Sequence, residues 1–247
     1  MMPYGLFRAG TSGLVLSEPN KKAYPPEFHD KSRLAYYASR FNTIEINSSF
    51  YRIPRCRTYT NWSVAVPPGF QFTVKLWRGI THEKEHDYVH LESFFAAINC
   101  LADKKGCLLV QFPAKTKMDF LMFKKLMEAL RRSDPNETWR LAIEFRDPVW
   151  YQKHVCDLLD EFNASLVLHD MPKSIPKEPN TKAPFVYIRF HGEKGDYRGS
   201  YEDVFLMKKA DQIRIWLKEG KDVYAYFNNT IGAAAVNLKT LKEMIME

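Results

Sequence analysis

The chain has 247 residues, of which 45% are hydrophobic and 26% charged, a composition typical of a folded globular protein. This composition excludes a disordered chain, and no stretch approaches the roughly 20 apolar residues of a membrane-spanning helix. The formal net charge of +7 is typical of lysine-rich solvated faces, and it is also compatible with an anionic partner, either a phosphorylated metabolite or nucleic acid. Because the basic residues are dispersed along the chain, the sequence favours nucleic acid less than a small ligand.

The cysteines and the N-terminal residues bear on where the protein works. The first residues, MMPYGLFRAGTSG, contain no apolar core of a secretory signal. The four cysteines are scattered and form no C-x-x-C pair, which is typical of reduced thiols rather than of a disulfide framework or a zinc ribbon. We therefore expect a cytoplasmic protein. These cysteines are Cys56, Cys100, Cys107 and Cys156.

Short β-rich runs alternate with helical patterns along the whole chain. The predicted strands cover Leu6–Thr11, Thr43–Asn47, Phe70–Leu76, Cys107–Phe112, Leu141–Phe145, Ser165–His169, Phe185–Phe190 and Val223–Phe227. The predicted helices cover Ser32–Arg40, Leu91–Asp103, Phe120–Arg131, Tyr151–Phe162, Val204–Lys218 and Ala233–Met246.

This alternation predicts an α/β fold: a single (β/α)8 TIM-type barrel, as one domain over residues 1–247. An open doubly wound sheet is the alternative, but the glycine-rich dinucleotide fingerprint is absent after the first strand. One connection breaks the pattern, because prolines at 172, 176, 179 and 184 exclude a regular helix between the sixth and seventh strands. We expect an irregular loop there.

Side chains alternate between the two faces of a strand, so charged residues of several strands share one predicted face. Glu45 and Asn47 oppose Ile44 and Ile46, and the third, fifth, seventh and eighth strands repeat the pattern. The apolar face must meet the outer helices, so the polar face points into the barrel. Charges would then converge at the C-terminal ends of the strands, where barrel enzymes place their sites. A salt-bridged network that only fills the barrel is the alternative interpretation.

Several of these runs also resemble one known family. GTSG (10–13), FNTIEINSSFYRIP (41–54), FQFTVKLWRGITHEKE (70–85), VQFP (110–113), IEFRDPVW (143–150), VYIRFHG (186–192) and VYAYFNNTIGAAAVN (223–237) are similar to the YecE-like family, also called domain of unknown function 72. The resemblance implies a TIM-type barrel and leaves the reaction open. The family often has an aromatic residue after GTSG, where this chain has Leu14 and Val15. The motif positions that the resemblance implies are Glu45, Asn47, Tyr51, Lys75, Thr81, His82, Gln111, Glu144, Arg146, Arg189, His191 and Asn228.

Metal chemistry is the first of the site hypotheses. His82 to His86 match H-E-x-x-H, but this zinc-protease pattern works on a helix, whereas here it follows a strand as a loop. Glu45, Glu144, Asp170 and His191 are compatible with a divalent cation. Three cations on the same inner surface, Lys75, Arg146 and Arg189, argue against one. We therefore predict no metal site, and the sequence names no cofactor.

Proton transfer and anion binding are the favoured hypotheses. Lys75 and Glu144 are candidates for a proton-transfer pair with Glu45 beside them, although a structural ion pair explains them as well. The residues 228–232 precede an alanine-rich helix, whose N-terminus offers N–H groups for a phosphate beside Arg189 and His191. An ordinary helix cap is the alternative.

The leading hypothesis is an enzyme for a small polar, anionic or sugar-like metabolite. The alternatives are a nucleic-acid-binding or processing protein and a barrel that binds a ligand without catalysis. Loop aromatics that could stack on a sugar or base are Tyr51, Trp77, Trp150 and Tyr197. The predicted catalytic residues are Lys75, Glu144 and Glu45, and the predicted substrate-binding residues are Asn47, Tyr51, His82, Gln111, Arg146, Asp170, Arg189, His191, Asn228 and Gly232.

Overall fold

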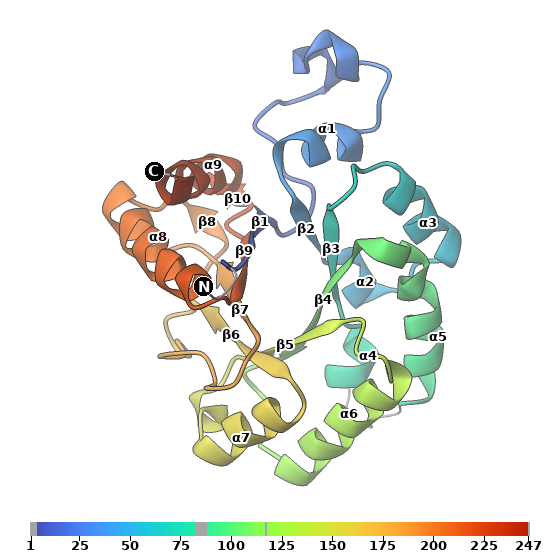
Figure 1. Cartoon of the computed structure of the whole chain (residues 1–247), viewed down its shortest axis with the longest axis vertical. Helices are drawn as coiled ribbons and strands as arrows, with labels where there is room; N and C mark the ends of the chain where they lie inside the picture. Colours follow the sequence, from blue (N-terminus) through green and yellow to red (C-terminus); the bar gives the residue numbers. More distant parts are fainter. Residues whose placement is uncertain (1–3, 83–87, 117, 247) are drawn as a thin grey trace.

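The computed structural model of the protein describes residues 4–82, 88–116 and 118–246. At its centre a parallel eight-stranded sheet curls into a barrel, with helices around its outside (Figure 1). Neighbours in the sheet follow chain order, as a TIM-type barrel requires. The barrel strands are β1 (Phe7–Thr11), β2 (Thr43–Ile46), β3 (Gln71–Lys75), β4 (Lys105–Phe112), β5 (Arg140–Phe145), β6 (Ala164–His169), β7 (Phe185–Phe190) and β9 (Asp222–Phe227).

The helices lie between successive strands, and none of the described ones is long and apolar enough to cross a bilayer. The outer layer consists of α1 (Arg33–Arg40), α3 (Cys56–Val64), α5 (Val89–Ile98), α6 (Phe120–Ser133), α7 (Lys153–Glu161), α8 (Asp203–Lys218) and α9 (Ala234–Met246). Shorter elements are η1 (Lys21–Ala23), η2 (Pro26–Phe28), α2 (Ser48–Tyr51), α4 (Arg78–Thr81), η3 (Asn99–Lys104), η4 (Pro148–Trp150) and the two-residue strands β8 (Arg198–Gly199) and β10 (Ile231–Gly232).

The predicted fold is confirmed, since all eight predicted strands form within two residues of their expected bounds. The irregular connection between β6 and β7 is confirmed as well. In this connection, the side chain of Asn180 makes hydrogen bonds to the backbone of β6, as a neighbouring strand would. Its side chain accepts a hydrogen bond from the Leu166 N–H (2.8 Å) and donates one to the Ala164 carbonyl (2.9 Å).

The barrel has two apolar layers, of which the alternation predicts the outer one but not the inner one. One lies between the outer face of the sheet and the helices, and Ile44, Val74 and Phe145 belong to it. The other fills the lumen and is made of Cys107, Leu109, Ala142, Val167, Phe185, Tyr187, Tyr224 and Tyr226.

The hydroxyl groups of tyrosines in the lumen form hydrogen bonds with polar side chains of β2 and β3. The Tyr224 hydroxyl donates to Gln71 Oε1 (2.7 Å). One layer higher, the Tyr226 hydroxyl lies 2.7 Å from the hydroxyls of Thr43 and Thr73. This hydrogen-bonded floor closes the barrel beneath the charged residues, because buried hydroxyls without partners would be costly.

The seam between β1 and β2 is closed largely by side chains. Asn42 accepts from the Ala9 N–H (3.0 Å), and the Tyr37 hydroxyl accepts from the Thr11 N–H (2.8 Å) and donates to the Thr43 carbonyl (3.1 Å). Among the described residues, the backbone bridge between these two strands joins Ser12 to Glu45, at their C-terminal ends. A glycine is required at position 10, where a Cβ would lie 2.1 Å from the Thr43 oxygen.

Replacing Tyr37 with phenylalanine is expected to lower the free energy of unfolding by about 1–3 kcal/mol, because an N–H and a carbonyl in the buried seam lose their shared partner. Chemical denaturation of the wild type and of Tyr37→Phe measures the difference. Equal midpoints and slopes would show that the hydroxyl does not hold the seam.

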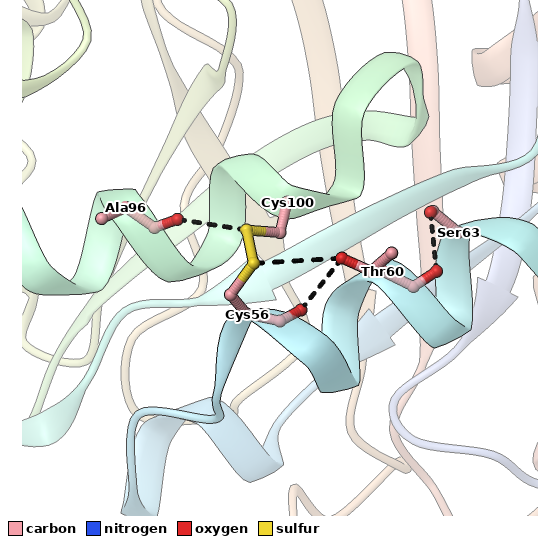
Figure 2. The surroundings of a disulfide bond; sticks show 5 residues. All are labelled: Cys56, Thr60, Ser63, Ala96 and Cys100. Atoms are coloured by element: carbon pink, nitrogen blue, oxygen red, sulfur yellow. Dashed lines mark hydrogen bonds between the residues drawn. A yellow bond between two sulfur atoms is a disulfide. The ribbon is translucent and has the colours of Figure 1, made fainter.

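The expectation of four reduced cysteines is wrong for two of them. Cys56 at the start of α3 and Cys100 in η3 form a disulfide (Figure 2). Their Cα atoms lie 5.5 Å apart although 44 residues separate them in the chain. The sequence could not show this pairing, because α3 was not predicted and its packing beside the end of α5 is a tertiary contact. Cys107 and Cys156 are free.

Removing this disulfide with Cys56→Ala and Cys100→Ala is expected to lower the free energy of unfolding by roughly 2–4 kcal/mol, since the bond restrains a long loop in the unfolded chain. Cys156→Ala is the matched control, because this half-buried thiol is free. Denaturation of oxidised wild type and both variants tests the expectation. A double variant no less stable than the control would contradict it.

Candidate functional site

A pocket of about 180 Å³ opens at the C-terminal ends of the barrel strands. This volume lies below the roughly 300–1,000 Å³ of drug-sized ligand sites. Among the residues that the structure describes, three cations and no carboxylate line the pocket, so its wall is positively charged. The lining residues are Asn47, Phe50, Tyr51, Lys75, Gln111, Arg146, Arg189, Tyr197 and Asn228.

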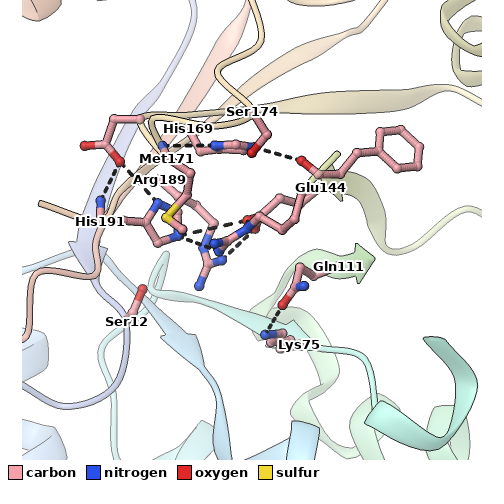
Figure 3. A network of polar contacts seen from close by, with 12 residues as sticks. Ser12, Lys75, Gln111, Glu144, His169, Met171, Ser174, Arg189 and His191 are labelled. Carbon is pink, nitrogen blue, oxygen red and sulfur yellow. Dashed lines mark hydrogen bonds and ion pairs between the residues drawn. The ribbon is translucent and has the colours of Figure 1, made fainter. Parts of the chain in front are cut away.

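Beneath this pocket, Arg189 holds two carboxylates from other strands. Its Nη1 donates to Glu144 Oε2 at 2.6 Å (Figure 3). Its Nη2 donates to Glu45 Oε1 at 2.7 Å. Both carboxylates are fully buried, and the arginine is 2% exposed. Glu45 also accepts from the hydroxyls of Ser12 and Tyr187, each at 2.7 Å. The structure thus brings together Glu45, Glu144 and Arg189, as the alternation predicted.

A second arginine extends the network toward β6. Arg146 donates from Nε to Glu144 Oε1 and from Nη2 to His191 Nε2, the latter at 2.9 Å. Because arginine only donates, His191 Nε2 must be the acceptor, which leaves the ring proton on Nδ1. That nitrogen lies 3.2 Å from Asp170 Oδ1, and Asp170 also accepts from the Tyr201 hydroxyl. His191 is therefore a neutral link that orients Arg146.

The arginines keep both glutamates ionised. Burial alone would raise the pKa of Glu144, but the charges of Arg146 and then Arg189 outweigh it and hold this pKa well below its usual value. Burial likewise opposes ionisation of Glu45, and Arg189 lowers the pKa of that carboxyl. Burial lowers the pKa of His191 to about 4, which agrees with its neutral form. Carboxylates held in this way are poor proton acceptors.

Lys75 differs from the two arginines, because no described carboxylate lies within 4.0 Å of it to form an ion pair. Its Nζ donates to Gln111 Oε1 (2.7 Å) and lies 4.1 Å from the centre of the Phe50 ring. Burial and then the charge of Arg189 lower the pKa of Lys75 to about 8. Lys75 is therefore a pocket amine that can exchange a proton near neutral pH.

His82 lies beside the pocket without lining it. Its ring packs edge-on against Phe50, with 4.8 Å between the ring centres, and Nδ1 is 2.7 Å from the Thr81 hydroxyl. Burial and the nearby charge of Lys75 lower its pKa to about 4. His82 thus supports Phe50 from behind. The rest of the His82 to His86 motif lies outside the described residues.

Gly232 also lies away from the pocket, in the β10 strand that pairs with β8. Its N–H donates to the Asn229 carbonyl, and the N–H of Ala233 donates to the Gly199 carbonyl, each at 3.0 Å. A Cβ at Gly232 would lie 2.2 Å from that Gly199 oxygen. Close approach of two backbones therefore explains this glycine. The N–H groups of Gly232 and Ala233 are thus already bonded to carbonyls of the protein.

The loop aromatics have different roles. Tyr51 and Tyr197 stand at the rim of the pocket and are 70% and 37% exposed. Trp150 instead stacks on Phe145 in the core, with 4.7 Å between ring centres, and is 1% exposed. The idea that Trp150 is a stacking contact for a ligand is therefore wrong. Trp77 packs against the outer core.

Three residues of the site were not among those predicted from the sequence. Tyr187 lies two residues before Arg189 on the same strand face, so the alternation could have found it. Ser12 directly follows β1, at the end of the barrel that carries the site. Phe50 had no such signal, because α2 was not predicted. Among the described residues, no group of three or more His, Cys, Asp or Glu side chains is placed to hold a metal ion.

The fold and the site define a class of protein: a TIM-type barrel with a cationic pocket above a buried ion-pair network. The chain belongs to the family described as protein of unknown function DUF72, whose family model matches residues 8–247. It is 28% identical to the UPF0759 protein YunF of Bacillus subtilis, over 90% of this chain and 89% of that protein.

Solved structures from two organisms share the fold. A DUF72 family protein of Enterococcus faecalis matches with a TM-score of 0.79 at 21% identity, over 98% of this chain and 96% of that one. A DUF72 family protein of Thermotoga maritima matches with a TM-score of 0.75 at 25% identity, over 98% and 100% of the two chains. These likenesses agree with the family assignment.

Proposed function

We propose that the protein is an enzyme for a small anionic metabolite, which binds in the pocket at the C-terminal mouth of the barrel. The observation that carries this proposal is the charge of the lining. Lys75, Arg146 and Arg189 line the pocket, whereas the two carboxylates that balance the arginines are buried beneath it. An anionic group that displaces water there meets fixed positive charge at low local dielectric.

Lys75 is the residue to which we assign proton transfer. It lies in the pocket, lacks an ion pair with a described carboxylate, and has a pKa near 8. The sequence also favoured Glu144 and Glu45 for catalysis, but their oxygens accept from buried donors, and their pKa values are lowered. Our proposal therefore gives these glutamates a positioning role, in which they hold Arg146 and Arg189 at the pocket wall.

The experiment is a metabolite screen with wild type and Lys75→Met. Purified protein is incubated with a cell extract, and metabolites that change or are retained are identified by mass spectrometry. The proposal expects an anionic metabolite that wild type converts and Lys75→Met does not. Retention without conversion would favour a non-catalytic ligand-binding barrel. Exclusive enrichment of nucleic acid would overturn the proposal.

A further inference from the structure

Two polar atoms of the pocket residues are buried and have no hydrogen-bond partner among the described residues: Nε of Arg189 and Oδ1 of Asn47. Both residues line the same pocket. Buried polar groups are nearly always hydrogen-bonded, and each exception calls for an explanation. The Arg189 atom is a hydrogen-bond donor and the Asn47 atom is an acceptor. A ligand that satisfies both must therefore carry both an acceptor and a donor.

The donor is fixed by the ion-pair network. Arg189 uses Nη1 on Glu144 and Nη2 on Glu45, and its third nitrogen, Nε, has no acceptor in the described chain. Lys75 lies in the same pocket and has three ammonium hydrogens, one of which goes to Gln111. Both residues therefore require oxygen acceptors from the ligand, and both favour oxygens that carry negative charge.

The acceptor is fixed by Glu45. The amide nitrogen of Asn47 donates to Glu45 Oε1 at 3.2 Å, and a carboxylate can only accept. The amide is thereby oriented, and its Oδ1 must accept from a donor outside the described chain. An alkyl carboxylate or an alkyl phosphate dianion offers no such donor, whereas a hydroxyl group does.

We infer that the pocket binds a small hydroxylated anion, with its carboxylate or phosphate oxygens at Lys75 and Arg189 and a hydroxyl donating to Asn47. This inference rests on the proposed function and narrows its substrate class. The small volume of the pocket suits a short-chain compound. The same residues would bind a hydroxy acid or the phosphate ester of a polyol.

The test compares ligands that differ in their hydroxyl groups, by calorimetry at pH 7. Glycerol 3-phosphate is paired with n-propyl phosphate, and glycerate with propionate. Wild type is expected to bind the hydroxylated member of at least one pair roughly 10-fold more tightly, the worth of one hydrogen bond. In Asn47→Ala this preference should fall to about one, with the affinity for the alkyl anion retained. The preferred pair distinguishes phosphate from carboxylate.

The outcomes separate the inference from the proposed function. Equal affinities within both pairs in wild type would overturn the hydroxyl requirement and leave an anion site. A preference that survives in Asn47→Ala would also overturn the inference, because another residue would then read the hydroxyl. No binding of any of the four anions at millimolar concentration would overturn the inference together with the proposed function. Parallel weakening of both members in Asn47→Ala would reveal a merely structural role.

Discussion

Replacing Arg189 with methionine is expected to lower the free energy of unfolding by about 4 kcal/mol or more. The substitution removes the shared partner of Glu45 and Glu144, which are both fully buried. Breaking a buried ion pair from one side typically costs about 3–5 kcal/mol, because the remaining charge is left without compensation. Denaturation followed by circular dichroism measures the loss.

The matched control is Arg140→Met. Arg140 pairs with Asp222 at 3.2 Å, but its side chain is 39% exposed, so the cost should be at most about 1 kcal/mol. Adding Glu45→Gln to Arg189→Met should recover part of the loss, since Glu45 is the carboxylate left without a cation, whereas Glu144 keeps its ion pair with Arg146. An Arg189→Met protein as stable as the control would show that the network does not hold the barrel mouth.

The pH dependence gives a second readout for the same variant. In wild type, Arg189 lowers the pKa of Glu45, so this contribution to stability is present above the unfolded pKa and is lost as pH falls through the folded value. Without Arg189, burial raises the pKa of Glu45, and the sign reverses. The stability of Arg189→Met relative to wild type should therefore improve as pH falls from 8 toward 5.

Replacing Lys75 with methionine is expected to reduce turnover by about 10²–10⁴-fold, the usual contribution of a positioned acid or base. The fold should be retained, because no described carboxylate depends on Lys75 for an ion pair. Its lowered pKa means that the buried ammonium costs stability at pH 7. The variant should therefore be as stable as wild type or up to roughly 3 kcal/mol more stable.

Lys153→Met is the control for this variant. Lys153 lies on α7 with its side chain 87% exposed and pairs only with Asp157 among the described carboxylates, so turnover should not change. The assay uses the metabolite that the extract screen identifies. Undiminished turnover in Lys75→Met would remove Lys75 from the chemistry. A destabilised variant would instead point to a structural role for the amine.

The barrel could be predicted because its determinants are local. Strands such as 185–190 and 223–227 are rich in β-branched and aromatic residues, and period-two alternation separates the lumen from the outer face. Prolines likewise exclude a helix after β6 wherever the loop packs. The charged face of each strand could be read in the same way, so Lys75, Arg146 and Arg189 were found as candidates.

Which of these cations pairs with which carboxylate could not be predicted, because the pairing depends on partners from other strands. Nothing in the sequence shows that Arg189 takes both glutamates and leaves Lys75 without a carboxylate within 4.0 Å among the described residues. The disulfide between Cys56 and Cys100 also depends on tertiary packing. Gly232 was predicted to bind substrate because it precedes a helix N-terminus. In the structure the backbone of β8 lies against it instead.

The most direct measurement for the anion site is a calorimetric titration of wild type and Lys75→Met with sulfate, at pH 7 and at pH 9. Sulfate keeps its charge over this range, whereas Lys75 loses its proton as pH rises through about 8. Wild type should bind sulfate roughly tenfold more weakly at pH 9, and Lys75→Met should bind weakly and equally at both. Tight binding to Lys75→Met with the same pH dependence as wild type would contradict the account.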